Sequence, residues 1–218
     1  MPQRLDFSGR FAGQRTVFGR HVVDGDDGQL VLGLAGMSGR LVGLNPANGS
    51  TRWEAAIAAP RGTNEVERLV DLVGSVSRVG NVVCARAFQS AVGCVDALTG
   101  RLLWTKSAVA SEGVGGNDTA VFGAESDGNV LAWNRTNGER LWASERLRYR
   151  TLSAPLAVGR SVVVGDSTGL VHFLSREDGS ALTRVSTDGS AIAADPVLAG
   201  NTVVVVTHNG GVFGFQPE

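Results

Sequence analysis

The sequence has no long hydrophobic run and no helical periodicity. Its longest apolar stretch, Thr202–Val206, is far shorter than the ~18 residues of a membrane-spanning helix and predicts a buried strand. No segment carries the spacing of a long amphipathic helix. Proline is scarce, with 6 residues against 30 glycines, which suits many tight turns between strands. A net formal charge of −1 without a basic stripe argues against a nucleic-acid partner.

Recognisable catalytic and metal-binding patterns are missing as well. The three histidines stand apart from any cysteine or carboxylate at ligand spacing, so no metal site is predicted. The segment Asp24–Gly28 starts like a calcium loop but lacks the later ligands and the closing glutamate, and it is interpreted as a turn. No serine or cysteine stands in the context of a catalytic nucleophile. The sequence therefore predicts neither an enzyme nor a cofactor site.

A short hairpin unit recurs along the chain. In Ser90–Lys106, two alternating segments flank the polar connection Ala97–Gly100, whose glycine adopts a positive φ at little cost. Similar units occupy Gly39–Ala55, Asp127–Ser144 and Thr168–Val185, and a half unit lies at Gly210–Phe215. The turn glycines, spaced by 51, 38 and 41 residues, are Gly49, Gly100, Gly138 and Gly179. A period near forty with four short strands per unit is typical of a β-propeller blade.

The sequence thus predicts an all-β fold, a single partial β-propeller of antiparallel four-stranded blades over residues 1–218. About four and a third blades are expected, at residues 20–58, 74–107, 111–145, 152–186 and 193–215, the last without its fourth strand. Trp53, Trp104 and Trp142 hold one position of the repeat, which predicts a packing wedge between neighbouring sheets. Open edges and uncovered flanks at both ends predict self-association of this chain.

Two connections between blades mix charged and apolar residues. Ala59–Leu72 is the longest one, and Val66, Leu69 and Leu72 stand there among charges. A contact surface and a solvated one-turn helix both fit this pattern. In Glu145–Leu152, arginines alternate with apolar residues, which fits a patch for an anionic partner but is more typical of a solvated edge.

Three stretches resemble a known family. The repeat VDALTGRLLW, Val95–Trp104, resembles the A-x-D-x-x-T-G-x-x-x-W unit of quinoprotein dehydrogenases and related propellers. NEVERLVDL, Asn64–Leu72, and VVVGDSTGLVHFLSREDG, Val162–Gly179, narrow the resemblance to BamB, the propeller lipoprotein family of the outer-membrane β-barrel assembly machinery. The resemblance covers roughly residues 20–218 and implies the C-terminal portion of an eight-bladed ring.

That resemblance implies a function and a set of contacts. The family is a non-enzymatic scaffold on the periplasmic face of the outer membrane that binds the barrel-assembly subunit BamA. Other assembly subunits and unfolded outer-membrane proteins are further candidate partners. The implied contact residues are Leu5 and Phe7 in one loop, and Glu67, Arg68, Leu69 and Asp71 in its neighbour.

The sequence departs from the family at several of these places. Ser8 replaces the arginine of the first loop, and Val73 stands where a second aspartate can occur. No signal-peptide pattern or anchor cysteine follows Met1, which predicts a fragment or a gene start placed inside a longer protein.

A fragment of a quinoprotein dehydrogenase is the competing interpretation. That class needs calcium ligands and usually an adjacent cysteine pair, whereas Cys84 and Cys94 are ten residues apart. Aligning Ser90 with the bulge glycine Gly169 makes 88–90 a three-residue turn and places Cys84 opposite Cys94. The periplasm that the resemblance implies would permit a disulfide, and two buried thiols are the alternative.

Overall fold

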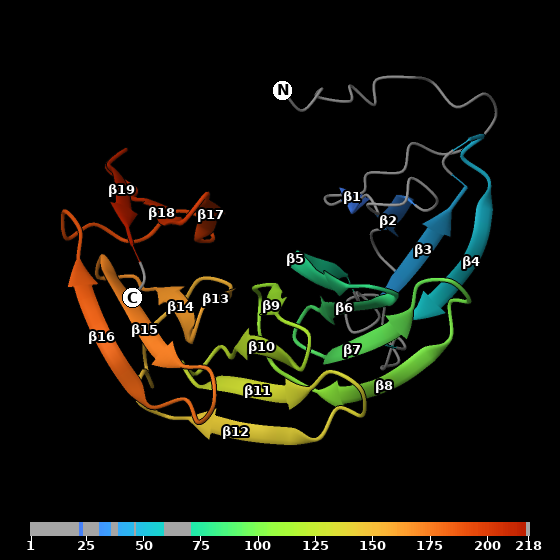
Figure 1. Ribbon diagram of the computed structural model, residues 1–218, viewed down its shortest axis with the longest axis horizontal. Helices are drawn as coiled ribbons and strands as arrows, with labels where there is room; N and C mark the ends of the chain where they lie inside the picture. The colour runs from blue at the N-terminus through green and yellow to red at the C-terminus, as the bar shows by residue number, and fades with distance from the viewer. Residues whose placement is uncertain (1–21, 24–30, 36–38, 46, 59–70, 217–218) are drawn as a thin grey trace, which may run out of the picture.

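The computed structural model is an open arc of five antiparallel β-sheets around a common centre (Figure 1). It describes residues 39–45, 47–58 and 71–216, and the backbone alone of residues 22–23 and 31–35. Within these ranges, no helix is long and apolar enough to cross a membrane. Four sheets have four strands and the last has three, so the predicted all-β propeller architecture is confirmed.

Each sheet is a meander whose strands pair in chain order. The first contains β1 (Val22–Val23), β2 (Val31–Ala35), β3 (Arg40–Leu44) and β4 (Thr51–Ala56). The second contains β5 (Leu72–Val79), β6 (Val82–Ala87), β7 (Ala91–Asp96) and β8 (Leu102–Ser107). The third contains β9 (Val114–Gly116), β10 (Ala120–Ala124), β11 (Val130–Asn134) and β12 (Arg140–Ser144). The fourth contains β13 (Leu156–Val158), β14 (Ser161–Gly165), β15 (Leu170–Ser175) and β16 (Ala181–Ser186). The fifth contains β17 (Val197–Ala199), β18 (Thr202–Val206) and β19 (Val212–Phe215).

One strand begins earlier than the sequence indicates. Leu72, expected in the exposed insertion, is only 5% exposed and opens β5. The pairing of β5 with β6 shifts between Val73 and Ser77, and Gly74 within this bulge has a φ of 63°. The glycine therefore interrupts the pairing without ending the strand, and the strand reaches back into the predicted insertion.

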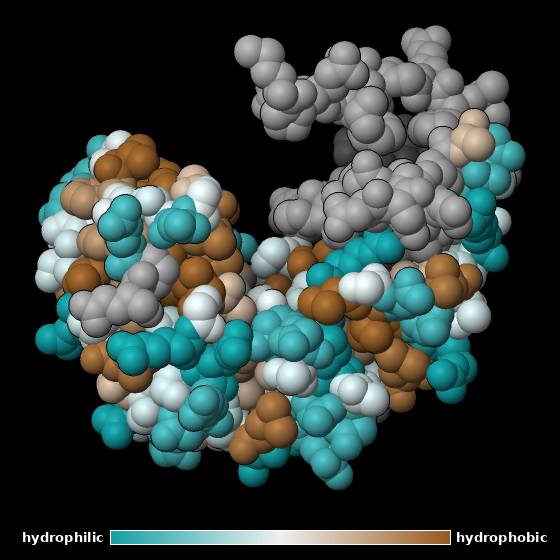
Figure 2. Space-filling model, viewed as in Figure 1, coloured by the Kyte–Doolittle hydropathy of each residue, from teal (hydrophilic) through white to brown (hydrophobic). Residues whose placement is uncertain are grey.

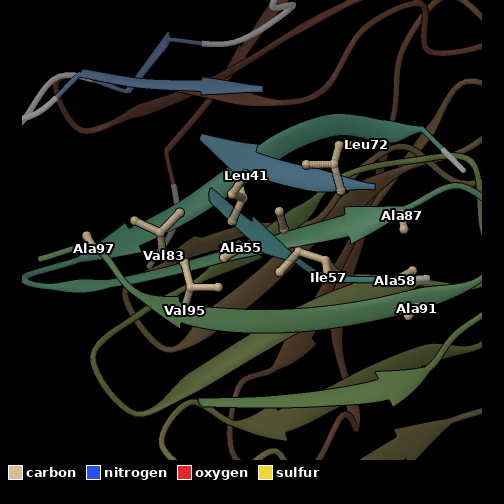
Figure 3. Packing of buried hydrophobic residues seen from close by; sticks show 11 residues of the cluster. Leu41, Ala55, Ile57, Ala58, Leu72, Val83, Ala87, Ala91, Val95 and Ala97 are labelled. Atoms are coloured by element: carbon tan, nitrogen blue, oxygen red, sulfur yellow. The ribbon is translucent and has the colours of Figure 1, made fainter. Parts of the chain in front are cut away.

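The core lies between the sheets rather than inside any one of them. Leu41, Ala55 and Ile57 of the first sheet pack against Val83 and other small apolar residues of the second (Figure 3). Because both faces of an inner strand are covered in this way, β14 is buried at every position. The first strand of each sheet lies toward the centre, and in the four-stranded sheets the fourth strand forms the outer rim (Figure 1).

The repeated tryptophans join consecutive sheets, as predicted. Each indole Nε1–H donates to a backbone carbonyl of the next sheet: Trp53 to Ala97 at 2.9 Å, Trp104 to Arg135 at 2.7 Å, and Trp142 to Arg176 at 3.0 Å. Each ring also lies on a turn glycine of that sheet. Gly138, for example, has a φ of 72°, and a Cβ added there would lie 2.6 Å from the Trp104 ring. Both the left-handed backbone conformation and the close approach of the indole ring thus require glycine at this turn position.

The fifth sheet leaves apolar residues on the surface. Val197, Leu198 and Val212 are exposed, Val212 to 69%, and hydrophobic surface is visible at the β17–β19 end of the arc (Figure 2). Among the described residues, no fourth strand pairs with β19. This arrangement accords with an incomplete last blade, and self-association remains a prediction.

Candidate functional site

One end of the sheets gathers the longest connections of the molecule. Because the strands are antiparallel, the turn between the second and third strands of a sheet lies at the same end as the connections between sheets. We call this end the connection face. Its described residues are 39, 57–58, 71, 88–90, 108–113, 125–129, 145–155, 166–169, 187–196 and 207–211.

Backbone hydrogen bonds link these segments one after another. The Phe88 N–H donates to the Asp71 carbonyl at 2.7 Å, and the Gln89 N–H donates to the Ala110 carbonyl at 3.0 Å. The Ser126 N–H donates to the Val109 carbonyl and the Tyr149 N–H to the Asp127 carbonyl, both at 2.8 Å. Two further bonds, Ser167 to Thr151 and His208 to Ala191, continue the series into the fourth and fifth sheets. Segments that are far apart in the sequence therefore form one continuous, hydrogen-bonded surface.

Of the contact residues implied by the resemblance, Asp71 lies in the described part of the chain. It is exposed, directly precedes β5, and its carbonyl is anchored to the turn that follows β6. Leu5, Phe7, Glu67, Arg68 and Leu69 lie outside the described residues, and their role stays a prediction. The position of Asp71 places the end of the predicted partner loop on the connection face.

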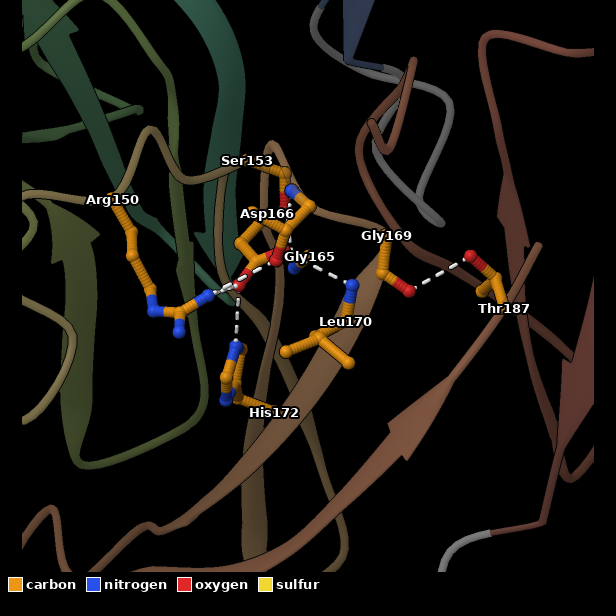
Figure 4. A network of polar contacts seen from close by, with 9 residues as sticks. Arg150, Ser153, Gly165, Asp166, Gly169, Leu170, His172 and Thr187 are labelled. Carbon is orange, nitrogen blue, oxygen red and sulfur yellow. Dashed lines mark hydrogen bonds and ion pairs between the residues drawn. The ribbon is translucent and has the colours of Figure 1, made fainter. Parts of the chain in front are cut away.

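A buried carboxylate organises the fourth sheet's part of this face (Figure 4). Asp166 is almost wholly buried and accepts hydrogen bonds from the N–H groups of Thr168 and Leu170 at 2.8 and 3.0 Å, and from the Thr168 hydroxyl at 2.8 Å. Nε2 of His172 lies 2.9 Å from Oδ2, and the Arg150 guanidinium forms an ion pair with the same oxygen. Asp166 thus holds its own turn and, through Arg150, the neighbouring connection.

These contacts set the protonation of the network. Burial alone would raise the pKa of Asp166, but hydrogen bonds from His172, Leu170 and Thr168 outweigh it and lower that pKa to about 2. Burial lowers the pKa of His172 despite the neighbouring carboxylate. At neutral pH the network therefore contains an ionised aspartate beside a neutral histidine.

A hollow of about 320 Å³ opens beside this network. It lies between the connections that lead into β9, β13 and β17, with Glu112, Thr151 and Asp195 in its lining. Burial, and then the charge of Asp195, raise the pKa of Glu112. The Ala154 N–H donates to the Asp195 carboxylate at 2.9 Å, so Asp195 fixes the backbone of the connection that leads into β13.

Two buried arginines join the second and third sheets, and sequence reasoning missed both. Arg86 of β6 donates to the carbonyl of Ala124 at 2.7 Å and pairs with Glu125 at 2.8 Å. Arg135 donates to the carbonyl of Asn117 at 2.5 Å and to the Ser77 hydroxyl. Burial lowers the pKa of both, that of Arg135 to about 10. They remain cations at neutral pH, and their hydrogen bonds are structural.

The two cysteines face each other as the turn alignment predicts. Cys84 pairs with Cys94 and Ala87 with Ala91 in the register of β6 and β7, and the structure joins the two sulfurs with Cα atoms 4.0 Å apart. The left-handed residue of the turn is Gln89, at φ 49°, rather than Ser90. Both cysteines are fully buried in the second sheet, so they do not form part of an open site.

The described residues contain no group of three or more histidine, cysteine or acidic side chains that could hold a metal ion. The DGDDG segment considered as a calcium loop, Asp24–Gly28, lies outside them.

Comparison with known proteins identifies the family. The family model described as outer membrane protein assembly factor BamB matches residues 12–144. The chain belongs to the BamB family. It is 46% identical over 192 residues to the BamB of Burkholderia pseudomallei, covering 88% of this chain and 50% of that protein. It is 37% identical over 187 residues to the BamB of Bordetella pertussis, covering 85% of this chain and 48% of that protein.

Solved structures agree with this assignment. The crystal structure of BamB from Moraxella catarrhalis matches with a TM-score of 0.80 at 28% identity, covering 88% of this chain and 57% of that one. The computationally designed Ika8 protein, at 18% identity and a TM-score of 0.70, shows the fold alone. The chain spans about half the length of the curated BamB proteins it matches.

Membership of the BamB family bears on whether the chain is an enzyme or an assembly factor. The relatives above carry the name of an outer-membrane protein assembly factor, not of an enzyme. The quinoprotein dehydrogenase interpretation, which rested on the shared repeat, finds no support in these names.

Proposed function

We infer that this chain is a non-enzymatic scaffold of outer-membrane protein assembly that binds the periplasmic domains of BamA through its connection face. Its site of action is then the periplasmic face of the outer membrane, among the other assembly subunits. Unfolded outer-membrane proteins are a further candidate partner. The observation that carries the proposal is the position of Asp71, exposed on a hydrogen-bonded face at the end of the family-like loop.

The physical role of this loop is to orient the partner. Charged groups on an exposed loop steer association and select against wrong partners. In the proposed contact, Glu67, Arg68 and Asp71 supply charge and Leu69 supplies an apolar anchor. The anchoring of Asp71 to the Phe88 N–H limits the entropy that ordering this end of the loop would cost on binding.

The test is a charge reversal with a matched control. Asp71→Arg should weaken binding of purified BamA periplasmic domains about tenfold, because one opposite-charge contact becomes a repulsive one. Glu139→Arg makes a similar change in an exposed turn at the opposite end of the sheets and should leave binding unchanged. Biolayer interferometry measures both, and circular dichroism verifies the fold. Equal binding by wild type and Asp71→Arg would reject this site.

A further inference from the structure

The connection between β12 and β13 begins with a tight turn at residues 145–150, which we call the Tyr149 turn. It contains two short reversals: the Arg148 N–H donates to the Glu145 carbonyl at 3.2 Å, and the Arg150 N–H to the Leu147 carbonyl at 3.1 Å. The Leu147 side chain is buried. Together with the Arg150–Asp166 ion pair, these contacts anchor the turn to the fourth sheet.

Tyr149, the single tyrosine of the chain, has an unusual conformation at the tip of this turn. Its φ is 67°, and Gln89 is the other non-glycine among the described residues with a positive φ. A bulky residue rarely adopts this left-handed conformation. Its side chain is 90% exposed, so burial of the ring does not compensate for the strain. Strained residues of this kind cluster at functional sites.

Neighbouring side chains orient the exposed ring. The Arg148 guanidinium lies over it, 5.5 Å from the centroid, and also pairs with Glu145 at 3.2 Å. Tyrosine and arginine are enriched among the residues that dominate binding energy at protein interfaces. A single exposed apolar residue is ordinary. Here, however, the exposed ring, its stacked cation and its strained backbone occur together in one turn.

The Tyr149 turn also continues the surface that begins at Asp71. Between them lie Phe88 and Val109, which are 44% and 53% exposed and belong to segments of the same hydrogen-bonded series. The Tyr149 N–H itself donates to the backbone carbonyl of Asp127 in that series at 2.8 Å. A stable protein interface buries about 800 Å² on each partner, more than one loop provides.

We propose that the Tyr149 turn is a second contact for the protein partner that binds at Asp71, with Phe88 and Val109 as the apolar surface between the two. The proposal rests on the proposed function and adds a binding residue to it. The occupant is one folded protein surface that covers the connection face from the second sheet to the connection between the third and fourth sheets. It meets the Tyr149 ring with an apolar depression and meets Arg146, which the same turn exposes, with acidic groups.

The experiment uses the full chain and BamA periplasmic domains as the probe. Tyr149→Gly removes the ring and suits the left-handed backbone, so folding should be preserved while binding weakens about tenfold. Tyr149→Phe keeps the ring and should bind like wild type. Leu98→Ala is the matched control, because Leu98 is 63% exposed in a turn at the opposite end of the sheets, and it should bind normally.

The outcomes separate this inference from the function on which it rests. Weaker binding by Tyr149→Gly, with Leu98→Ala unchanged, supports the second contact. If Asp71→Arg weakens binding and Tyr149→Gly does not, the second contact is wrong and the proposed function stands. If wild type does not bind the domains at all, both are wrong. Urea unfolding of Tyr149→Gly verifies that any loss of binding does not come from a loss of fold.

Discussion

Replacing Asp166 by asparagine removes the charge at the centre of the buried network while nearly keeping its volume. In the wild type, the carboxylate of Asp166 satisfies the turn that follows β14, the His172 ring and the Arg150 guanidinium (Figure 4). An asparagine amide can accept on one side only and presents its own donors to the other. We therefore expect Asp166→Asn to fold but to be less stable.

The magnitude follows from the pKa of Asp166. The difference between its ordinary value of 3.8 and about 2, at about 1.4 kcal/mol per pH unit, gives about 2.5 kcal/mol at neutral pH. For a chain of this size, such a loss corresponds to a decrease of about 5–10 °C in Tm. Because the pKa is lower in the folded state, this stabilisation is complete above about pH 4 and is lost as the pH falls toward 2.

The assay is urea unfolding followed by tryptophan fluorescence, for wild type and Asp166→Asn, between pH 7 and pH 3. The difference in unfolding free energy should be about 2.5 kcal/mol at pH 7 and about half of that at pH 3. Asp178→Asn, at an exposed turn aspartate that accepts the Ser180 N–H at 3.0 Å, should have little effect. A difference below about 1 kcal/mol at pH 7, or one that does not change with pH, would refute the role assigned to Asp166.

Three further predictions concern packing and assembly. Trp104→Ala should lower the unfolding free energy by about 3–5 kcal/mol, and Trp104→Phe by about 1–2 kcal/mol through loss of the bond to Arg135; a Trp104→Phe variant as stable as wild type in urea unfolding would contradict the hydrogen bond's contribution. Non-reducing mass spectrometry of periplasmically produced protein should find Cys84 and Cys94 joined, whereas alkylation of two free thiols in the native protein would exclude the bond. Light scattering over a concentration series should detect self-association through the exposed apolar residues of the β17–β19 sheet, and a stable monomer throughout would contradict it.

The repeat made the fold predictable from the sequence. Gly49, Gly100, Gly138 and Gly179 all have φ near 70°, as their turn positions predict. The tryptophan position was equally informative, because an identical residue at an identical place in successive sheets has the same neighbour each time. The pairing of Cys84 with Cys94 followed from aligning this turn with the repeat, since antiparallel register is set by the turn.

The contacts between sheets could not be predicted in the same way. Arg86 looks like a polar interruption of β6, and only the fold shows that it reaches Glu125 in the next sheet. Asp166, in the turn after β14, and His172, on β15, lie six residues apart, and Arg150 comes from another connection. The exposure and left-handed backbone of Tyr149 likewise depend on how the surrounding loops pack, which no local pattern in the sequence encodes.

Crosslinking tests most directly the proposal that the connection face binds the assembly complex. A photoreactive phenylalanine analogue at Phe88, on the connection face, should crosslink to BamA periplasmic domains. The same analogue at Leu98, at the opposite end of the sheets, should not. A crosslink from position 98 without one from position 88 would contradict the proposal that the connection face is the partner-binding surface.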